Sequence, residues 1–133
     1  DVKRAVSRCM ALFASNGETC IHLLQTSVIS PLKVLTAEGD TLCERFGALT
    51  IANLSLCKAN HSFLLENHSV ETLLPLTHSD DIETLRGVSF ALHSLSIHEE
   101  NHSLLEGTSV VKALVTLARC GDRDTALQAC LAT

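Results

Sequence analysis

The sequence predicts an all-helical protein built as a stack of similar three-helix repeats. The first observation is a period of about 41 residues that needs no gap. The tripeptide Asn60-His61-Ser62 returns as Asn101-His102-Ser103. The second observation is a set of apolar columns that persist through three repeats: Leu23, Leu64 and Leu105; Ile29, Val70 and Val111; Leu32, Leu73 and Leu114; Leu35, Leu76 and Leu117. These columns predict that every repeat adds equivalent side chains to one continuous core.

The third observation is a polar residue at three places in each repeat, where helices are expected to begin. The columns are Thr19, Asn60 and Asn101; Thr26, Asn67 and Thr108; Asp40, Asp81 and Asp122. Thr, Asn and Asp are good N-cap residues, because the side-chain oxygen accepts an unpaired amide of the first turn. Three caps in each period predict a short, a medium and a long helix per repeat.

The period divides one domain, residues 1–133, into the blocks 1–16, 17–57, 58–98 and 99–133. The first block is expected to be the long helix of a preceding repeat and the last a truncated repeat, so we expect a piece of a longer protein. Asn16-Gly17 is expected to end the first helix. Gly47 is expected to mark a close helix contact or a bend. Pro75 is expected to kink or shorten its helix, because it lies past the first turn.

Composition excludes several classes of protein. With 46% apolar and 19% charged residues the chain is not disordered. A net charge of −5, without a basic cluster interleaved with aromatic residues, argues against nucleic-acid binding. No apolar run reaches the ~18 residues of a membrane span, and no signal peptide is visible. The six cysteines form no CxxC pair, which favours a reducing compartment. We expect the cytoplasm, with the cytoskeleton or the cilium as a site of association.

Two segments of the long helices resemble a known repeat. Residues 48–55 (ALTIANLS) and 89–96 (SFALHSLS) resemble the small-x-x-Leu-x-Asn-Leu stretch in the third helix of armadillo repeats, and residues 60–76 resemble the two helices that follow it. The resemblance covers essentially the whole chain. It implies a right-handed α-solenoid whose third helices line a concave groove that binds extended peptides or other proteins, without enzymatic activity and without a cofactor. HEAT repeats have two helices per unit, which fits the three-cap pattern less well.

One subgroup of the family offers a sharper comparison. Importin-α proteins hold a Trp and an Asn one turn apart on each third helix, and these grip basic nuclear-localisation peptides. The corresponding positions here are Leu49 and Asn53 in one repeat, and Phe90 and Ser94 in the next. Only Asn53 matches, and the chain contains no Trp. A nuclear-transport adaptor is therefore the alternative function, disfavoured by the missing Trp array.

A column of arginines, Arg4, Arg45 and Arg86, leads the long helices. Residues spaced i, i+4 and i+8 share a helix face, and this gives the candidate protein-binding groove: Arg45, Leu49, Asn53, Arg86, Phe90 and Ser94. Because the planar guanidinium suits carboxylates, we hypothesise an acidic or mixed partner segment with apolar anchors. In the alternative interpretation, the arginines pair with acids of their own chain such as Glu44 or Glu83.

One catalytic motif is also matched. His98-Glu99-Glu100-Asn101-His102 satisfies H-E-x-x-H, the zinc-protease signature. That chemistry needs both histidines on one face of a single helix, whereas this stretch is expected to straddle a turn. A zinc hydrolase is the weaker interpretation, and we expect neither a metal ion nor a catalytic site. The preferred function is an interaction scaffold within a cytoskeletal or axonemal, adhesion or membrane-docking assembly, bound to partner proteins and to further armadillo repeats of the same chain.

Overall fold

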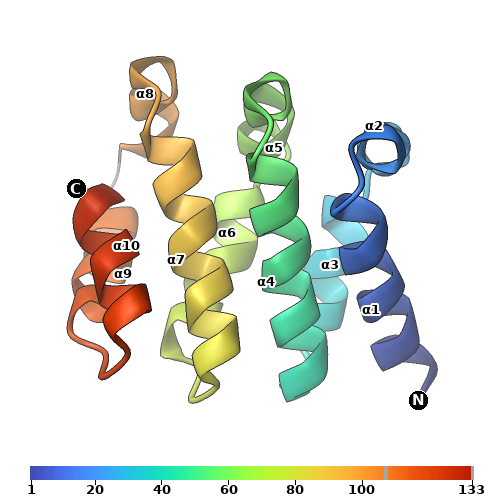
Figure 1. Ribbon diagram of the computed structural model, residues 1–133, viewed down its shortest axis with the longest axis horizontal. Coiled ribbons are helices and arrows are strands. Elements are labelled where there is room, and N and C mark those ends of the chain that lie inside the picture. The colour runs from blue at the N-terminus through green and yellow to red at the C-terminus, as the bar shows by residue number, and fades with distance from the viewer. Residues whose placement is uncertain (107, 133) are drawn as a thin grey trace.

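The computed structural model describes residues 1–106 and 108–132, together with the backbone but not the side chain of Thr108. In this part of the chain all regular structure is helical (Figure 1). Four long helices lie side by side in one layer: α1 (Val2–Ala14), α4 (Thr41–Ser55), α7 (Ile82–Ser96) and α10 (Arg123–Ala132). They are the third helices of successive repeats. No helix of the described residues is long and apolar enough to cross a membrane.

Shorter helices complete each repeat. The first helices lie at one end of the long ones: α2 (Gly17–Gln25), α5 (His61–Glu66) and α8 (His102–Leu105) (Figure 1). The second helices form a layer behind them: α3 (Ile29–Thr36), α6 (Ser69–Leu73) and α9 (Thr108–Ala118). Short 3-10 turns connect the long helices with the shorter ones. η1 (Lys58–Asn60) lies between α4 and α5, η2 (Leu74–His78) between α6 and α7, and η3 (Glu99–Asn101) between α7 and α8. The predicted α-solenoid of three-helix repeats is confirmed.

Equivalent leucines of different repeats have equivalent surroundings. Leu32 and Leu73 are completely buried, and Leu114 retains only 6% of its surface. Leu54 and Leu95 of the long helices are also completely buried and belong to the same continuous core. Burying a leucine side chain contributes about 1.5–3 kcal/mol relative to leaving it exposed. The repeated leucine columns are therefore the main source of stability, as the period predicts.

The predicted caps are partly confirmed. Asp40 and Asp81 cap α4 and α7 with their side chains, and Asp122 Oδ2 accepts from the amide of Thr125 at the start of α10. Five other predicted caps are wrong in their side-chain role or their position. Thr26 and Asn67 end the first helices, and Thr19 lies inside α2. Asn60 and Asn101 precede α5 and α8 without a side-chain cap bond. The predicted cap role of Thr108 lies outside the described side chains.

Two turns explain why the second helices begin without polar caps. Ser27 and His68 occupy equivalent positions in consecutive repeats, and both adopt a left-handed backbone conformation with φ of 56° and 64°. A residue in this conformation commonly ends a helix, and the second helices begin one or two residues later, at Ile29 and Ser69. Val28 and His68 stand at the cap positions of α3 and α6, and neither makes a side-chain cap bond.

The special residues of the helices behave in different ways. Pro75 shortens its helix as predicted, because α6 ends at Leu73 and the chain continues as a 3-10 turn. Gly47 marks a close contact, since a side chain there would collide with Thr36 of α3. The prediction for Gly17 is wrong: Asn16 caps α2 by accepting from the amides of Glu18 and Thr19, and Gly17 is the first residue of that helix.

Candidate functional site

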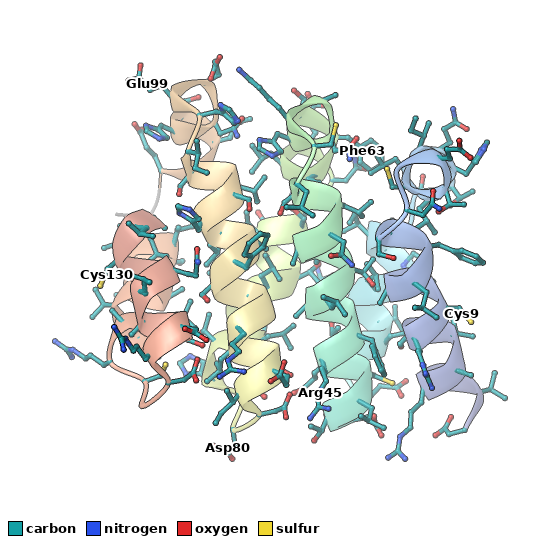
Figure 2. The ribbon with its side chains drawn as sticks, viewed as in Figure 1. Cys9, Arg45, Phe63, Asp80, Glu99 and Cys130 are labelled. Carbon is teal, nitrogen blue, oxygen red and sulfur yellow. The ribbon has the colours of Figure 1, made fainter. Side chains whose placement is uncertain are left out.

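The predicted groove residues belong to the long-helix layer formed by α1, α4, α7 and α10, whose outer surface we call the third-helix face. Figure 2 shows the side chains on this layer, with Arg45 labelled on α4. Leu49 of α4 is 40% exposed, and Phe90 stands at the equivalent position of α7 and is half-buried. Asn53 is half-buried, whereas Ser94 retains only 8% of its surface. The face therefore presents apolar side chains at equivalent positions in two neighbouring repeats, and Ser94 contributes little accessible surface.

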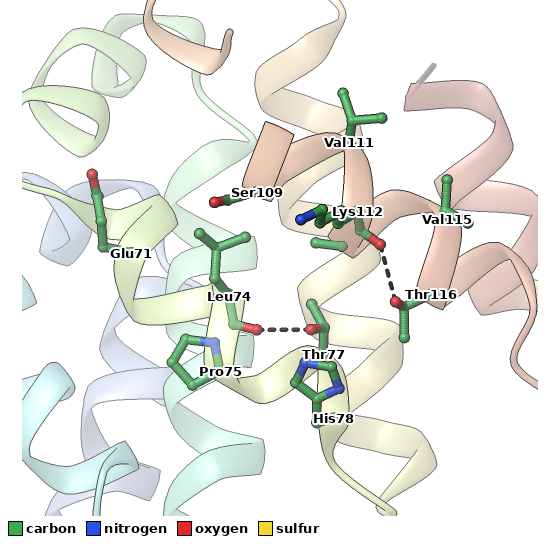
Figure 3. Close-up of a pocket in the computed structure, with 11 residues that line it drawn as sticks. Glu71, Leu74, Pro75, Thr77, His78, Ser109, Val111, Lys112, Val115 and Thr116 are labelled. Carbon is green, nitrogen blue, oxygen red and sulfur yellow. Dashed lines mark hydrogen bonds between the residues drawn. The ribbon is translucent and has the colours of Figure 1, made fainter. Parts of the chain in front are cut away.

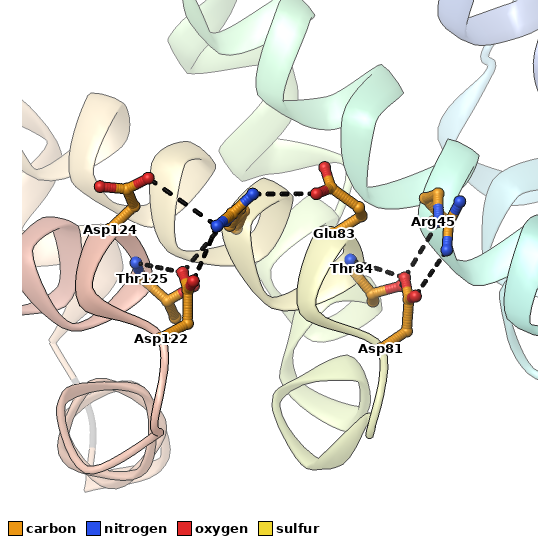
Figure 4. A network of polar contacts seen from close by, with 8 residues as sticks. Arg45, Asp81, Glu83, Thr84, Asp122, Asp124 and Thr125 are labelled. Atoms are coloured by element: carbon orange, nitrogen blue, oxygen red, sulfur yellow. Dashed lines mark hydrogen bonds and ion pairs between the residues drawn. The ribbon is translucent and has the colours of Figure 1, made fainter.

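The arginine column holds neighbouring repeats together (Figure 4). Arg45 donates from Nε and Nη2 to the two carboxylate oxygens of Asp81, at 3.1 and 2.6 Å. Arg86 does the same with Asp122, at 3.1 and 2.8 Å. Arg4 donates both groups to one oxygen of Asp40, at 2.9 and 2.8 Å. Each long helix is thus fixed to the first turn of the next one, and we call these contacts the Arg–Asp latches.

Each aspartate of a latch has a second role as a helix cap. Asp81 Oδ2 accepts from both the amide and the hydroxyl of Thr84, at 2.9 and 2.8 Å. The hydrogen bond from Arg45 is the main cause that lowers the pKa of Asp81 to about 2, from an ordinary value of 3.8. Bonding to Arg4 lowers the pKa of Asp40 to about 2 as well. Hydrogen bonds that favour the ionised form produce this direction of shift.

The latches decide between the two interpretations of the arginines. Arg45 pairs across the repeat with Asp81 and not with Glu44, which instead accepts from the hydroxyl of Ser79 at 3.3 Å. Arg86 does pair with Glu83, at 2.9 Å, in addition to its latch. The arginines are therefore engaged within the chain, and the main partner is an aspartate that the sequence interpretation did not name.

Asn53 also connects two repeats. Its Nδ2 group donates to the carbonyl of Ala11 in α1, at 3.3 Å. The amide nitrogen is thus directed at the neighbouring long helix, while the side chain stays half-buried on the third-helix face. The importin-like role of an asparagine needs an amide available to a bound peptide. One of the two N–H groups of the Asn53 amide already donates to the carbonyl of Ala11.

The repeated Asn-His-Ser tripeptide forms a buried network at the ends of the long helices. Asn60 Nδ2 donates to the carbonyl of Leu54 at 2.9 Å, and Asn101 Nδ2 donates to that of Leu95 at 2.8 Å. Asn101 also contacts His61 Nδ1 at 2.9 Å, and His61 Nε2 contacts the carbonyl of Ser55 at 2.7 Å. The two asparagines satisfy carbonyls that a helix end leaves unpaired, which the exact return of the tripeptide could have indicated.

The H-E-x-x-H match lacks the geometry of a zinc site. His98 precedes the turn η3, whereas His102 is the first residue of α8, so the two rings do not share one helix face. His102 Nε2 is engaged with the carbonyl of Ser96 at 2.8 Å. Among the described residues there is no group of three or more His, Cys, Asp or Glu side chains placed to hold a metal ion.

Two hollows differ in what they offer a ligand. One of about 290 Å³ lies on the third-helix face and includes Phe90, His93 and Gln128 in its lining. A larger one of about 850 Å³ lies in the second-helix layer, between η2 and α9, and includes Leu74, Pro75 and Val111 (Figure 3). Two hydroxyls of the larger hollow bond within the chain: Thr77 donates to the carbonyl of Leu74 and Thr116 to that of Lys112. Pro75, where the chain changes from α6 to the 3-10 turn η2, is one of its lining residues.

Comparison with known proteins identifies the fold. No protein-family model and no curated protein matches the sequence. Among solved structures, a computationally designed armadillo repeat protein for modular peptide recognition superposes with a TM-score of 0.85 over 96% of this chain, at 20% identity. A designed armadillo repeat protein in complex with the peptide (KR)4 superposes with a TM-score of 0.79 over 92% of the chain, at 22% identity.

The chain therefore has the fold of armadillo-repeat proteins, a right-handed α-solenoid. It spans about half the length of these designed proteins, 55% of the first and 53% of the second. An engineered protein, with a TM-score of 0.85 and 19% identity over 97% of the chain, has the same architecture. At these identities the similarity establishes the fold, and the function has to be argued from the surface of this chain.

Proposed function

We propose that this chain is a non-enzymatic scaffold that binds an extended segment of a partner protein across its third-helix face. One observation carries the proposal: apolar side chains that are exposed or half-buried recur at equivalent positions of α4 and α7 and just beyond their ends. Leu49 corresponds to Phe90, and Leu56, 65% exposed, corresponds to Ile97, 60% exposed. Exposed apolar clusters on a soluble protein mark interaction sites.

The spacing of the repeats sets the spacing of the partner's anchors. Packed helices lie roughly 8–10 Å apart, and an extended chain advances about 3.3 Å per residue. A segment that runs across α4 and α7 therefore moves by roughly two to three residues per repeat. We propose a partner motif with apolar side chains at that spacing, contacting Leu49 in one repeat and Phe90 in the next.

The structural neighbours support the binding of an extended peptide segment. One designed protein of the same fold was made for modular peptide recognition, and another is seen with a bound peptide. We leave acidic residues out of the proposed motif, because each guanidinium of the latches already holds a carboxylate. We also disfavour a basic (KR)-type ligand, because Leu49 and Phe90 stand where the importin-like array has Trp.

We further propose that the chain works in a reducing compartment such as the cytoplasm, within a larger cytoskeletal, adhesion or membrane-docking assembly. The thiols of Cys20 and Cys43 support the first part of this proposal. Both are buried in helices as free cysteines, where cysteine packs as a small hydrophobe. The compartment is tested by the localisation of the tagged full-length protein.

A peptide selection tests the binding function. The chain is used to select from a library of random 12-residue peptides, and the affinity of enriched peptides is measured by fluorescence anisotropy. Removing one apolar anchor costs about 1–2 kcal/mol, roughly tenfold in affinity. We expect this loss for Leu49→Ser and for Phe90→Ser. Val34→Ser is the matched control, because Val34 is 62% exposed on α3 of the second-helix layer.

Two results contradict the proposed function. The first is a selection that enriches no peptide. The second is a set of peptides whose affinity falls equally for Val34→Ser and for Leu49→Ser, because binding would then lie elsewhere on the surface. A (KR)4 peptide serves as the reference for importin-like recognition, and we expect it to bind at least tenfold more weakly than the selected peptides.

A further inference from the structure

The hollow on the third-helix face is lined by three successive repeats. Its lining residues are Ser55, Leu56, His61, Phe90, His93, Ser94, Ile97, His98 and Gln128. They come from α4 and its end, from α5, from the second half of α7 and its end, and from α10. The set contains no carboxylate, ammonium or guanidinium group. The hollow is therefore a mixed apolar and hydrogen-bonding site, placed where the proposed partner segment would cross.

Two polar atoms of this hollow lack a hydrogen-bond partner among the described residues. They are Nδ1 of His93 and Oε1 of Gln128, and both atoms are buried although their residues are only half-buried. In the described part of the chain only one other buried side-chain polar atom, Oγ of Ser69, is in the same condition. A buried unpaired polar atom is costly and rare in native proteins. Both atoms are covered in this conformation, so a ligand in the hollow would satisfy them after a rotation of the two side chains.

The ring nitrogens of His61, another histidine of the lining, are already engaged. His61 contacts the carbonyl of Ser55 through Nε2 and the side chain of Asn101 through Nδ1. Its ring also packs at a tilt against that of His98, with 5.4 Å between centroids. His61 is therefore part of the wall, and His93 and Gln128 are the groups that face the ligand.

The position of Gln128 carries a different residue in each repeat, Phe46 in α4 and Gly87 in α7. Gln128 of α10 stands where α7 has Gly87. A side chain at Gly87 would lie 3.1 Å from Cβ of Ala48 and 3.4 Å from the amide nitrogen of Leu49, so this position faces the preceding long helix at close range. By repeat equivalence, Gln128 faces α7 beside Ser89 and Phe90. Its side chain then forms a wall of the hollow beside α7.

The chemistry of the two unpaired groups points to one kind of ligand group. A neutral imidazole nitrogen is a donor or an acceptor depending on its tautomer, and a side-chain amide presents either its oxygen or its nitrogen. An amide ligand offers both a donor and an acceptor and can match either arrangement. A charged ligand group would lose its hydration without finding a counter-charge in this lining. The lining therefore favours a neutral group that offers both a donor and an acceptor, and a carboxamide is such a group.

We propose that this hollow is a subsite for the side-chain carboxamide of an Asn or Gln in the bound partner segment. The proposal rests on the proposed function, because it assigns one residue of the partner motif. The carboxamide lies between His93 and Gln128 and exchanges hydrogen bonds with both. Leu56 and Ile97, at the edge of the hollow, contact the aliphatic part of the same side chain or its neighbours.

A small-molecule probe tests the subsite without a known partner. Propionamide is titrated into isotope-labelled protein, and the side-chain amide of Gln128 and the ring nitrogens of His93 are followed by NMR. Butanone, which lacks N–H groups, and propionate, which is charged, are probes of similar size. We expect saturable shifts with propionamide that are at least fivefold larger than those with either other probe at equal concentration.

The glutamines of the chain provide a matched pair of variants. Gln128→Leu keeps the size of the side chain and should abolish the response of His93 to propionamide. Gln25→Leu, at an exposed position of α2, should leave the response intact. Gln128→Glu is the second variant if Gln128→Leu does not fold, and it should reduce the response at least fivefold because it places a charge in the hollow. Both Gln128 variants should also shift the peptide selection away from Asn and Gln.

The outcomes separate the subsite from the binding function. Equal shifts with all three probes, or a propionamide response that survives Gln128→Leu, overturn the carboxamide subsite. If no propionamide response occurs but selected peptides still lose affinity with Phe90→Ser, the subsite fails while the binding function stands. If propionamide responds as expected but no peptide is enriched, the subsite is supported and the proposed binding function is overturned.

Discussion

The contact between α4 and α7 and the contact between α7 and α10 are equivalent in the repeat, yet they differ at their centre. Both begin with an Arg–Asp latch of nearly the same geometry, with Nη2 distances of 2.6 and 2.8 Å. In the middle of the first contact, Gly87 brings the helix backbone against Ala48. In the second contact Gln128 occupies the same position and lines a hollow with an unpaired polar atom.

The difference shows how a repeat protein can separate stability from recognition. Residues that return in every repeat, such as the latches and the buried leucines, hold the stack in register. Residues that interrupt the repeat are not needed for that purpose and can shape a surface. Gln128 and His93 have no counterpart of the same type one repeat earlier, where Gly87 and Ala52 stand. The departures are therefore the best place to look for ligand contacts.

The largest expected effect comes from adding a side chain where α4 and α7 are in close contact. In Gly87→Val the added side chain meets Ala48, including its backbone carbon at 3.3 Å, so the helices must separate. Overpacking of this kind costs about 1–3 kcal/mol. Gly17→Val is the control, because nothing lies within 4 Å of a side chain at Gly17. Denaturant unfolding measures both, and equal midpoints for the two variants would mean that the α4–α7 contact is looser than described.

A smaller loss is expected from breaking a latch. Asp81→Ala removes the cap of α7 and the partner of Arg45, and loss of an N-cap alone costs about 1–2 kcal/mol. The adjacent exposed Asp80 provides the control, because Asp80→Ala should change stability by less than about 0.5 kcal/mol. Asp122→Ala should destabilise in the same direction as Asp81→Ala, since the two contacts share the latch. If thermal unfolding showed the same loss of stability for Asp80→Ala as for Asp81→Ala, the latches would have no structural role.

The smallest expected effect is a change in the acid sensitivity of the latches. The pKa of Asp81 in the fold is about 2, below the ordinary 3.8. The unfolded chain therefore takes up protons first as the pH falls. The stabilisation is complete above about pH 4 and is lost between about pH 4 and pH 2. Denaturant midpoints measured across this window should fall less steeply for Asp81→Asn than for the wild type, and parallel curves would contradict the assignment.

Much of the fold can be predicted from the sequence because it repeats. The leucine columns and Asp40, Asp81 and Asp122 have one physical role in every repeat, so the period reveals both the core and the starts of the long helices. The starts of the second helices could not be found in this way. They depend on a left-handed backbone conformation at Ser27 or His68. Glycine is the residue type that predicts this conformation, and neither residue is a glycine.

The candidate site is harder to predict, because its contacts cross between repeats. Arg45 and Asp81 are 36 positions apart, and only the stacking of the helices shows that they meet. The sequence pattern therefore placed the arginines on the correct face and suggested the wrong acid for Arg45. Leu49 and Phe90 are found at the surface where the pattern put them. Nothing in the local sequence of Gln128 indicates that its amide is buried beside His93.

The most direct test of the account is the crystal structure of the Gln128→Gly variant beside that of the wild type. Our account says that Gln128 makes the centre of the second contact differ from that of the first. It predicts that α10 closes on α7 with the backbone contact that Gly87 makes with Ala48, and that the hollow shrinks. A variant in which α7 and α10 keep their wild-type spacing, and in which the hollow keeps its volume, would contradict it.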